Sequence, residues 1–373
     1  MNFEFSDDQL QLRDAVAKWV EKGYSFDRRR KIADAGGFDK AAYTELAELG
    51  LCGLYVPEAD GGLGMGPVEG MVVMEELGRG IVLEPLAQAL VAGAVLAHYG
   101  DADVKAKWLP QIASGEALVV LAHVERAGRY KLERCATVAK SADGAWNLTG
   151  SKSLVPVGDH AQAFLVPAMA AGKMALFVVE AGATGVSTRG YGTQDGGRAA
   201  ELALNGAAAT LVTADGLAAL EHAVDIGMAC LCAEAVGTME KTLVITADYL
   251  NTRKAFGVAI SSFQALRHKA SDMKMELELG RSMSYYASLK LNTPAPERRA
   301  ALARAKYQLC NSMRHVGQTA VQLHGGIGVT DEYIISHYFR KLTQMEMTYG
   351  DGLHQLGEVA SRMQDTAGVF AEV

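Results

Sequence analysis

Apolar residues recur with a helical period through the first third of the chain. Val16, Trp19 and Val20 lie three to four positions apart, the spacing that gathers side chains on one face of a helix. Ser6 precedes them, with Gln9 three residues later, which is the pattern of a capping box at a helix start. Further helices are predicted over residues 40–49, 67–77, 86–98 and 101–113.

From about Gly115 the pattern changes to short runs of β-prone residues separated by turns. The sequence Ala-Asp-Gly-Ala at 142–145 predicts a hairpin turn between two of these runs. About one hundred residues of this kind indicate a compact β-barrel or sandwich. The predicted strands cover residues 117–124, 135–140, 146–149, 163–167 and 175–180, and the segment of Leu202 and Leu204.

Helical periodicity returns at about Asp215 and continues to the end of the chain. The longest run, 217–253, has apolar residues at a period of 3.6 and no proline, and runs at 263–289, 296–323 and 333–349 follow it. Long helices with short connections are best satisfied by an antiparallel four-helix bundle. The predicted fold is therefore α+β and mainly α, with an N-terminal helical domain (1–115), a middle β-domain (116–214) and a C-terminal bundle (215–373).

Composition and charge restrict the function. Of the 373 residues, 49% are hydrophobic and 21% are charged, the balance of a packed globular protein. A net charge of -7 argues against nucleic acid as a partner, because no basic excess is available to displace counterions. The N-terminus has no signal-peptide pattern, and no apolar run reaches the ~18 residues of a membrane span. The chain is therefore expected to be cytoplasmic, without a membrane partner.

The five cysteines have no spacing typical of a metal site, so no metal is predicted. An odd number of cysteines in a reducing compartment is better explained as small buried hydrophobic residues than as disulfides.

Three motifs occur in a fixed order along the chain. The first begins with Glu48-Leu49-Gly50-Leu51 and ends with Met74-Glu75-Glu76-Leu77-Gly78-Arg79. The second is Arg253-Lys254-Ala255-Phe256-Gly257 with Gln264 after it. The third is Gln322-Leu323-His324-Gly325-Gly326-Ile327-Gly328. Together with the helix–strand–helix order, they resemble the acyl-CoA dehydrogenase family, and the resemblance covers nearly the whole chain.

The resemblance implies a flavoprotein of lipid metabolism that binds FAD between subunits, and hence a homo- or hetero-oligomer, a dimer or a tetramer. In the family, residues at the positions of Arg253, Phe256 and Gln264 reach the FAD of a neighbouring subunit. The always-charged guanidinium of Arg253 suits a pyrophosphate, and glycine at 325 and 326 lets the main chain approach a ligand. The implied cofactor-binding residues are Arg253, Phe256, Gln264, Gln322, Gly325, Gly326 and Gln355, whereas His324 is expected to pack locally.

The family also implies the reaction, which is α,β-dehydrogenation of an acyl-CoA thioester. A carboxylate removes a proton beside the thioester carbonyl, hydride passes to flavin N5, and an electron-transfer flavoprotein accepts the electrons. The family's Glu-Gly-Thr-like string corresponds here to Asp351-Gly352, which makes Asp351 the predicted base. Without a gap in the comparison, Tyr349 would take that place, and Asp-Gly is also a common turn dipeptide.

The middle domain departs from the family. The usual Thr-Glu-Pro-x-Ala-Gly-Ser-Asp is replaced by His123-Val124-Glu125-Arg126-Ala127-Gly128-Arg129-Tyr130, and Gly-x-Lys-x-Trp-Ile-Thr by Gly150-Ser151-Lys152-Ser153-Leu154-Val155-Pro156. These departures resemble bacterial members that pair with a distinct second subunit. One alternative to the dehydrogenase is therefore a non-catalytic partner subunit that completes another chain's FAD site. A second alternative is a related flavin oxidase, since an Asp base suits that chemistry.

Overall fold

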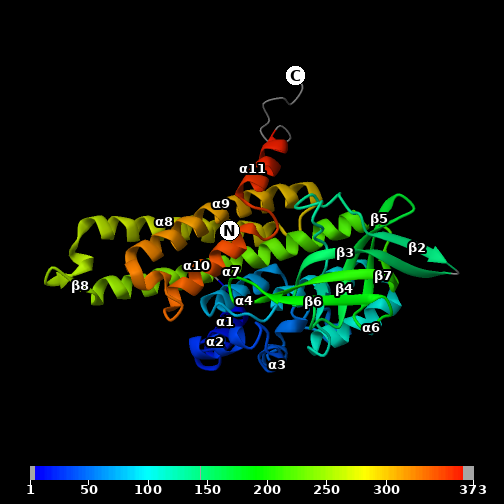
Figure 1. Cartoon of the computed structure of the whole chain (residues 1–373), viewed down its shortest axis with the longest axis horizontal. Helices are drawn as coiled ribbons and strands as arrows, with labels where there is room; N and C mark the ends of the chain where they lie inside the picture. The colour runs from blue at the N-terminus through cyan, green and yellow to red at the C-terminus, as the bar shows by residue number, and fades with distance from the viewer. Residues whose placement is uncertain (1–4, 143, 364–373) are drawn as a thin grey trace, which may run out of the picture. The chain divides into compact units, whose positions relative to one another are not determined.

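The computed structural model describes residues 5–142 and 144–363, and they form helices, then strands, then helices (Figure 1). The chain forms two compact units, each assembled from separate stretches. One contains residues 1–29, 67–82 and 228–373, and the other contains residues 30–66 and 83–227. The predicted fold class is confirmed. The limits of the three predicted domains remain a prediction. The two units are each built from separate stretches of chain, so they do not correspond to three consecutive domains.

The first unit is helical. It contains α1 (Asp7–Gly23), α4 (Pro67–Arg79), α8 (Gln264–Lys290), α9 (Ala295–His324), α10 (Ile334–Met347) and α11 (Gly352–Ser361), with most of α7 (Gly216–Thr252). The expected capping box is present at α1, where Ser6 Oγ accepts from Gln9 N at 3.2 Å and Gln9 Oε1 accepts from Ser6 N at 3.0 Å. The run 333–349 ends earlier than predicted, and α11 is an additional helix.

Helix α7 is long and apolar enough to cross a membrane, but 78% of its most apolar 18-residue window is buried within the protein. Its apolar composition therefore reflects its place in the core. Where α7 meets α4, glycines face the opposite backbone. A Cβ at Gly237 would lie 1.8 Å from the Glu75 carbonyl oxygen, and one at Gly78 would lie 2.1 Å from that of Glu234.

Charged side chains surround this crossing. Arg281 of α8 pairs with Glu75 of α4 at 2.5 Å and with Glu240 of α7 at 3.1 Å, and Arg79 pairs with Glu240 at 2.5 Å. Two guanidinium groups thus neutralise carboxylates from two helices, so that α4, α7 and α8 are joined by one network. The charged residues of the first motif therefore serve helix packing.

The second unit combines short helices with the strands. Its helices include α3 (Lys40–Glu48), α5 (Leu86–Tyr99) and α6 (Ala102–Ala113), with 3-10 turns η1 (Leu51–Gly53) and η2 (Glu58–Asp60), and α2 (Phe26–Asp34) extends across the division between the units. The strands are β1 (Val119–Leu121), β2 (Val138–Ala142), β3 (Ala145–Pro156), β4 (Ala163–Ala170), β5 (Lys173–Glu180), β6 (Val186–Gly192) and β7 (Arg198–Thr213).

The strands close into a barrel. Their order is β1-β4-β2-β3-β7-β5, and β5 pairs back to β4, while β6 pairs with β7. Ala142 and Ala145 face each other across the β2–β3 hairpin; Asp143 of the predicted turn lies outside the described residues. The β3–β7 register shifts between Lys152 and Val155. In that bulge Leu154 has a φ of 54° and is 58% exposed.

Candidate functional site

The segment between α7 and α8 folds into a small hairpin. Strand β8 (Lys254–Ala255) pairs with β9 (Val258–Ala259), and Arg253 accepts a backbone hydrogen bond from Ile260 N at 2.9 Å. Phe256 and Gly257 form the turn, with φ values of 55° and 83°. A positive φ is strained for phenylalanine, so the hairpin holds the backbone of Phe256 in a conformation that this residue would otherwise avoid.

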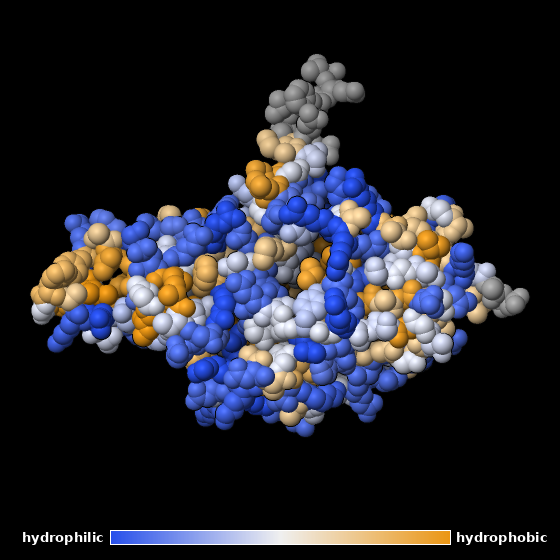
Figure 2. Space-filling view, in the orientation of Figure 1, coloured by the Kyte–Doolittle hydropathy of each residue, from blue (hydrophilic) through white to orange (hydrophobic). Residues whose placement is uncertain are grey.

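Phe256 is 95% exposed and touches only Phe263, with ring centroids 6.2 Å apart, among the aromatic contacts of the described chain. Apolar colour gathers at this end of the helices (Figure 2). Contiguous exposed apolar surface marks an interaction site. The exposed apolar residues of the hairpin and the adjoining helices include Val244, Phe256, Val258, Phe263, Met275 and Leu279.

Arg253 and Gln264 flank the hairpin, and both are exposed. Within residues 5–142 and 144–363, neither side chain has an ion pair or a hydrogen bond. Gln264 is the first residue of α8, which has no side-chain cap. The guanidinium of Arg253 and the amide of Gln264 therefore lie beside the exposed ring of Phe256 and have no hydrogen bond or ion pair within the described residues. They are available to bind a ligand or a second subunit.

The end of α9 carries the third motif and contacts the end of α7. The rings of Tyr249 and His324 stack at 4.4 Å, and Tyr249 Oη donates to the His324 carbonyl at 3.3 Å. Arg253 lies one helical turn after Tyr249 and donates its N–H to the Tyr249 carbonyl at 2.8 Å. The structure thus brings together Arg253 and Gly325, which are far apart in sequence.

Gly325 and Gly326 present bare main chain at this contact. Gly325 has a φ of 64°, and a Cβ at either position would meet nothing within 4 Å. The glycines are therefore not required by internal packing, and the space above them is open to a ligand. Gln322 is exposed one turn earlier. His324 packs locally, as expected: it is 3% exposed and its Nδ1 is 2.8 Å from the Ala320 carbonyl.

Asp351 and Gln355 lie at the corner between α10 and α11. Asp351 is the N-cap of α11 and accepts a hydrogen bond from His354 N at 2.9 Å. Gln355 is 2% exposed, and its amide donates to the Tyr349 carbonyl at 2.8 Å. The structure therefore gives both residues a role in the corner itself. Gln355 does not join the exposed set around Arg253.

A buried lysine that the sequence reasoning missed supports this corner. Lys306 of α9 is 0% exposed, and its Nζ donates to the carbonyls of Met345 and Glu346, each at 2.9 Å. These carbonyls belong to the last turn of α10, where a cation is favourable. The only sequence signal was a lysine on the apolar face formed by Leu302 and Leu309.

The second unit contains a polar cluster in the altered middle-domain motif. Glu125 is 8% exposed and accepts hydrogen bonds from Ala136 N (2.6 Å), Thr137 Oγ1 (2.7 Å) and Lys152 Nζ (2.7 Å). Burial raises the pKa of this carboxyl, but the hydrogen bonds from Lys152 and Ala136 outweigh it and lower the pKa to about 2. The Glu125 carboxyl is therefore ionised at neutral pH and holds these three groups together.

His123 borders the same cluster, and its ring nitrogen Nδ1 is inaccessible to solvent. Burial, together with the smaller effect of the nearby Lys152 ammonium, lowers the pKa of His123 from 6.5 to about 4. The imidazole is therefore neutral at neutral pH.

This depressed pKa predicts a loss of stability on mild acidification. Between about pH 6.5 and pH 4 the unfolded chain binds a proton at His123 that the folded chain does not, so unfolding becomes more favourable as the pH falls. A shift from 6.5 to about 4 corresponds to at most about 3 kcal/mol. Urea unfolding across this range should show the decline, and His123→Gln should flatten it. A slope unchanged in His123→Gln would contradict the prediction.

Comparison with known proteins identifies the family. The model of the acyl-CoA dehydrogenase N-terminal domain matches residues 6–116, and that of the C-terminal domain matches residues 214–364. Acyl-CoA dehydrogenase FadE12 of Mycobacterium tuberculosis is 30% identical over 357 residues, which cover 89% of this chain and 89% of FadE12. The chain belongs to the acyl-CoA dehydrogenase family. FadE27 of the same organism is 28% identical over 340 residues, covering 88% and 89%.

Solved structures agree with this assignment. The ChsE4-ChsE5 complex from Mycobacterium tuberculosis is similar with a TM-score of 0.89 and 25% identity, covering 98% of this chain and 100% of that one. A variant of the Tcur3481-Tcur3483 steroid ACAD gives a TM-score of 0.90 and 29% identity, covering 97% and 99%. Family membership confirms the predicted enzyme class, an oxidoreductase acting on acyl-CoA, and FAD as the cofactor.

Proposed function

We propose that this acyl-CoA dehydrogenase family member catalyses α,β-dehydrogenation of an acyl-CoA thioester and completes an FAD site between subunits. One observation carries the proposal: Arg253, Phe256 and Gln264 are exposed beside the open main chain of Gly325 and Gly326. A dinucleotide needs a fixed cation, a flat apolar face and close backbone approach, and this surface offers all three. Within the described residues, the side chains of Arg253 and Gln264 have no hydrogen bond or ion pair that such a ligand would have to displace.

Each residue would contribute a different interaction. Arg253 provides a permanently charged, planar fork suited to a pyrophosphate. Gln264 can donate and accept hydrogen bonds, and Phe256 covers apolar ring surface. Bound FAD supplies the hydride acceptor. Because these groups face outward, the dinucleotide would be shared with a neighbouring subunit, which makes the functional unit at least a dimer, and an electron-transfer flavoprotein is the proposed electron acceptor.

Asp351 remains the proposed base. The hydrogen bond from His354 N orients the Asp351 carboxylate. It also fixes the side chain at the start of α11.

Asp351→Asn tests the base directly. Asparagine is as good an N-cap as aspartate, so α11 should persist, whereas the carboxylate is lost. We expect acyl-CoA to bleach the flavin absorbance at least about 100-fold more slowly than in the wild type, the usual scale of general-base catalysis. Stopped-flow absorbance of the purified, yellow protein measures this rate.

The matched control is Asp101→Asn, because Asp101 caps α6 in the same way, accepting from Val104 N at 2.9 Å. This variant should bleach at the wild-type rate. Equal rates for wild type and Asp351→Asn would refute the proposed base. Hydrogen peroxide formation without an electron acceptor would instead identify an oxidase.

A second candidate is the non-catalytic partner subunit. It is favoured by the engagement of Asp351 in a cap and of Gln355 in the corner, and by the similarity to a solved two-component assembly, the ChsE4-ChsE5 complex. Under this reading the chain purified alone would be colourless, and flavin would bind only when a companion chain is added. Native mass measurement with and without the companion separates the two candidates.

A further inference from the structure

The connection between β1 and β2 concentrates positive charge in a chain that is otherwise acidic. Four cations occur within nine residues, namely Arg126, Arg129, Lys131 and Arg134, against the single acid Glu133, whereas the whole chain has a net charge of -7. All four are exposed. Local positive charge attracts anions.

The backbone of this connection is ordered by its own hydrogen bonds. Gly128 N and Arg129 N both donate to the Glu125 carbonyl at 3.0 Å, and Lys131 N and Arg134 N continue the turns. A Cβ at Gly128 would lie 3.0 Å from the Arg134 carbonyl oxygen, so the loop folds tightly on itself. Lys131 and Arg134 are therefore held near each other.

Glu125, the buried acid at the start of this connection, cannot neutralise these cations. Glu125 is already engaged by Lys152, Thr137 and Ala136. Arg126 reaches Glu201 only at 3.5 Å, and Arg129 lies over the Tyr130 ring at 5.1 Å. In the part of the chain that the structure describes, Lys131 and Arg134 have no ion pair.

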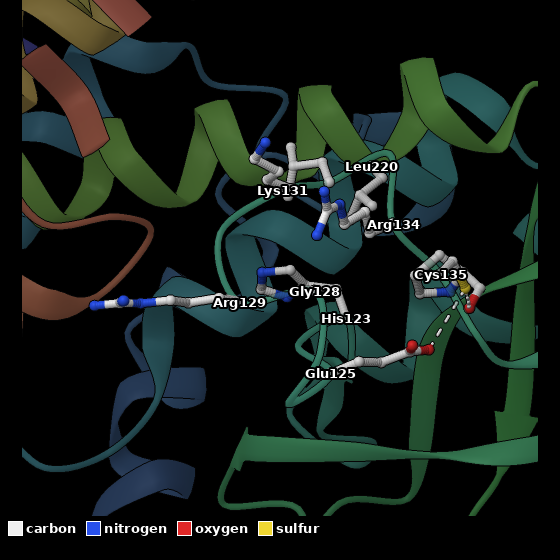
Figure 3. Close-up of a pocket in the computed structure, with 10 residues that line it drawn as sticks. His123, Glu125, Gly128, Arg129, Lys131, Arg134, Cys135 and Leu220 are labelled. Carbon is white, nitrogen blue, oxygen red and sulfur yellow. Dashed lines mark hydrogen bonds between the residues drawn. The ribbon is translucent and has the colours of Figure 1, made fainter. Parts of the chain in front are cut away.

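Both residues line a small pocket of about 260 Å³, including its open mouth. Figure 3 shows Arg134 directing its guanidinium over His123, with Lys131 beside it, whereas Arg129 extends away. The Glu125–Cys135 contact forms the opposite wall. A ligand at the mouth would therefore meet a guanidinium and an ammonium above a neutral imidazole.

We propose that Lys131 and Arg134 bind a phosphate group of the coenzyme A portion of the substrate. This inference rests on the proposed function, because an acyl-CoA thioester is the phosphorylated substrate of the family's reaction, whereas the pyrophosphate of FAD is assigned above to Arg253. A guanidinium fork and an ammonium point charge are the two side-chain groups that recognise phosphate most often. The pocket is too small for a nucleotide, so the phosphate sits at its mouth and the remainder of the ligand lies outside.

Calorimetric titration of the assembled protein with coenzyme A, dephospho-coenzyme A and pantetheine tests the site. We expect Lys131→Gln/Arg134→Gln to weaken coenzyme A binding at least about tenfold, the scale of one charged hydrogen bond, and to reduce its salt dependence. Pantetheine, which has no phosphate, should bind wild type and variant equally. A difference that persists with dephospho-coenzyme A assigns the site to the diphosphate, and one that vanishes assigns it to the 3′-phosphate.

Lys140→Gln/Arg189→Gln is the matched control, because it removes the same charges from exposed positions in strands β2 and β6 and should leave affinity unchanged. Equal affinity of wild type and the Lys131/Arg134 variant for coenzyme A would overturn the inference. A loss of coenzyme A affinity in the control variant as large as that in the Lys131/Arg134 variant would also overturn it. Binding is measured without turnover. A protein that binds coenzyme A through these residues but never bleaches its flavin would therefore refute the proposed catalysis and leave this site standing.

Discussion

Gly237→Ala should destabilise the helical unit by about 3 kcal/mol or more. In a helix interior alanine is normally better than glycine by about 1 kcal/mol, so helix propensity alone predicts a gain. Packing predicts the opposite, because the added Cβ would lie 1.8 Å from the Glu75 carbonyl oxygen and 3.1 Å from Arg79 N. Backbone atoms cannot rotate away as side chains do, and overpacking costs typically 1–3 kcal/mol or more.

The clash would also disturb the charge network at the crossing. Arg281 and Arg79 bridge carboxylates on α4 and α7, and separating the helices would lengthen these ion pairs. Thr238 Oγ1, which donates to the Gly78 carbonyl at 3.1 Å, would lose its partner across the crossing. The expected loss therefore exceeds the steric term alone, and urea unfolding followed by far-UV circular dichroism measures it.

Gly357→Ala provides the comparison. Gly357 also lies inside a helix, α11, but a Cβ there would meet nothing within 4 Å. This variant should gain up to about 1 kcal/mol from propensity. If Gly237→Ala lowers the free energy of unfolding and Gly357→Ala raises it, the close approach of α4 and α7 requires glycine. A neutral or stabilising Gly237→Ala would contradict the close crossing.

The contrast between these glycines illustrates what the sequence could predict. The long proline-free run predicted α7 within one or two residues, because period and propensity are local properties. Gly237 and Gly357 look alike in sequence, and only the tertiary approach of α4 distinguishes them. Helix α2 was missed because six of its nine residues are charged, which hides an apolar face. Strand β6 was missed because it is largely exposed and contains two glycines.

In the candidate site, too, some residues could be predicted from the sequence and others could not. Arg253, Gln264 and the two glycines could be selected from the order of motifs, and the Tyr249–His324 contact explains why distant motifs meet. The corner at Asp351 could not be resolved, because the dipeptide Asp-Gly suits a turn, a helix cap and a base equally. Lys306 was missed since its partners are main-chain carbonyls, which leave no pattern in the sequence.

Lys152→Met should cost about 3–5 kcal/mol near neutral pH, the usual effect of leaving one member of a buried ion pair alone. Lys152 is 1% exposed, and its Nζ donates to Glu125 at 2.7 Å and to the Pro167 carbonyl at 2.9 Å. Methionine matches the length of the aliphatic stem, so little cavity is created. The loss would arise from the uncompensated Glu125 carboxylate and the unpaired carbonyl.

The pH dependence separates this cause from simple misfolding. In the wild type the pKa of Glu125 is lowered to about 2, so its contribution is present above its ordinary value of 4.5 and is lost as the pH falls towards 2. Without Lys152 the buried carboxylate should take up a proton more readily. The deficit of Lys152→Met relative to wild type should therefore shrink between about pH 7 and pH 4, as measured by urea unfolding at both values.

The matched control is the double variant Glu125→Gln/Lys152→Met, which removes both charges. It should recover part of the stability lost in Lys152→Met, because it avoids the buried charge and the single amide oxygen of glutamine can still accept a hydrogen bond from either Ala136 N or Thr137 N. Its deficit should also be independent of pH over this range, apart from the slope due to His123. A double variant as unstable as Lys152→Met at every pH would mean that Lys152 acts through packing and the Pro167 carbonyl, and that its pairing with Glu125 contributes little.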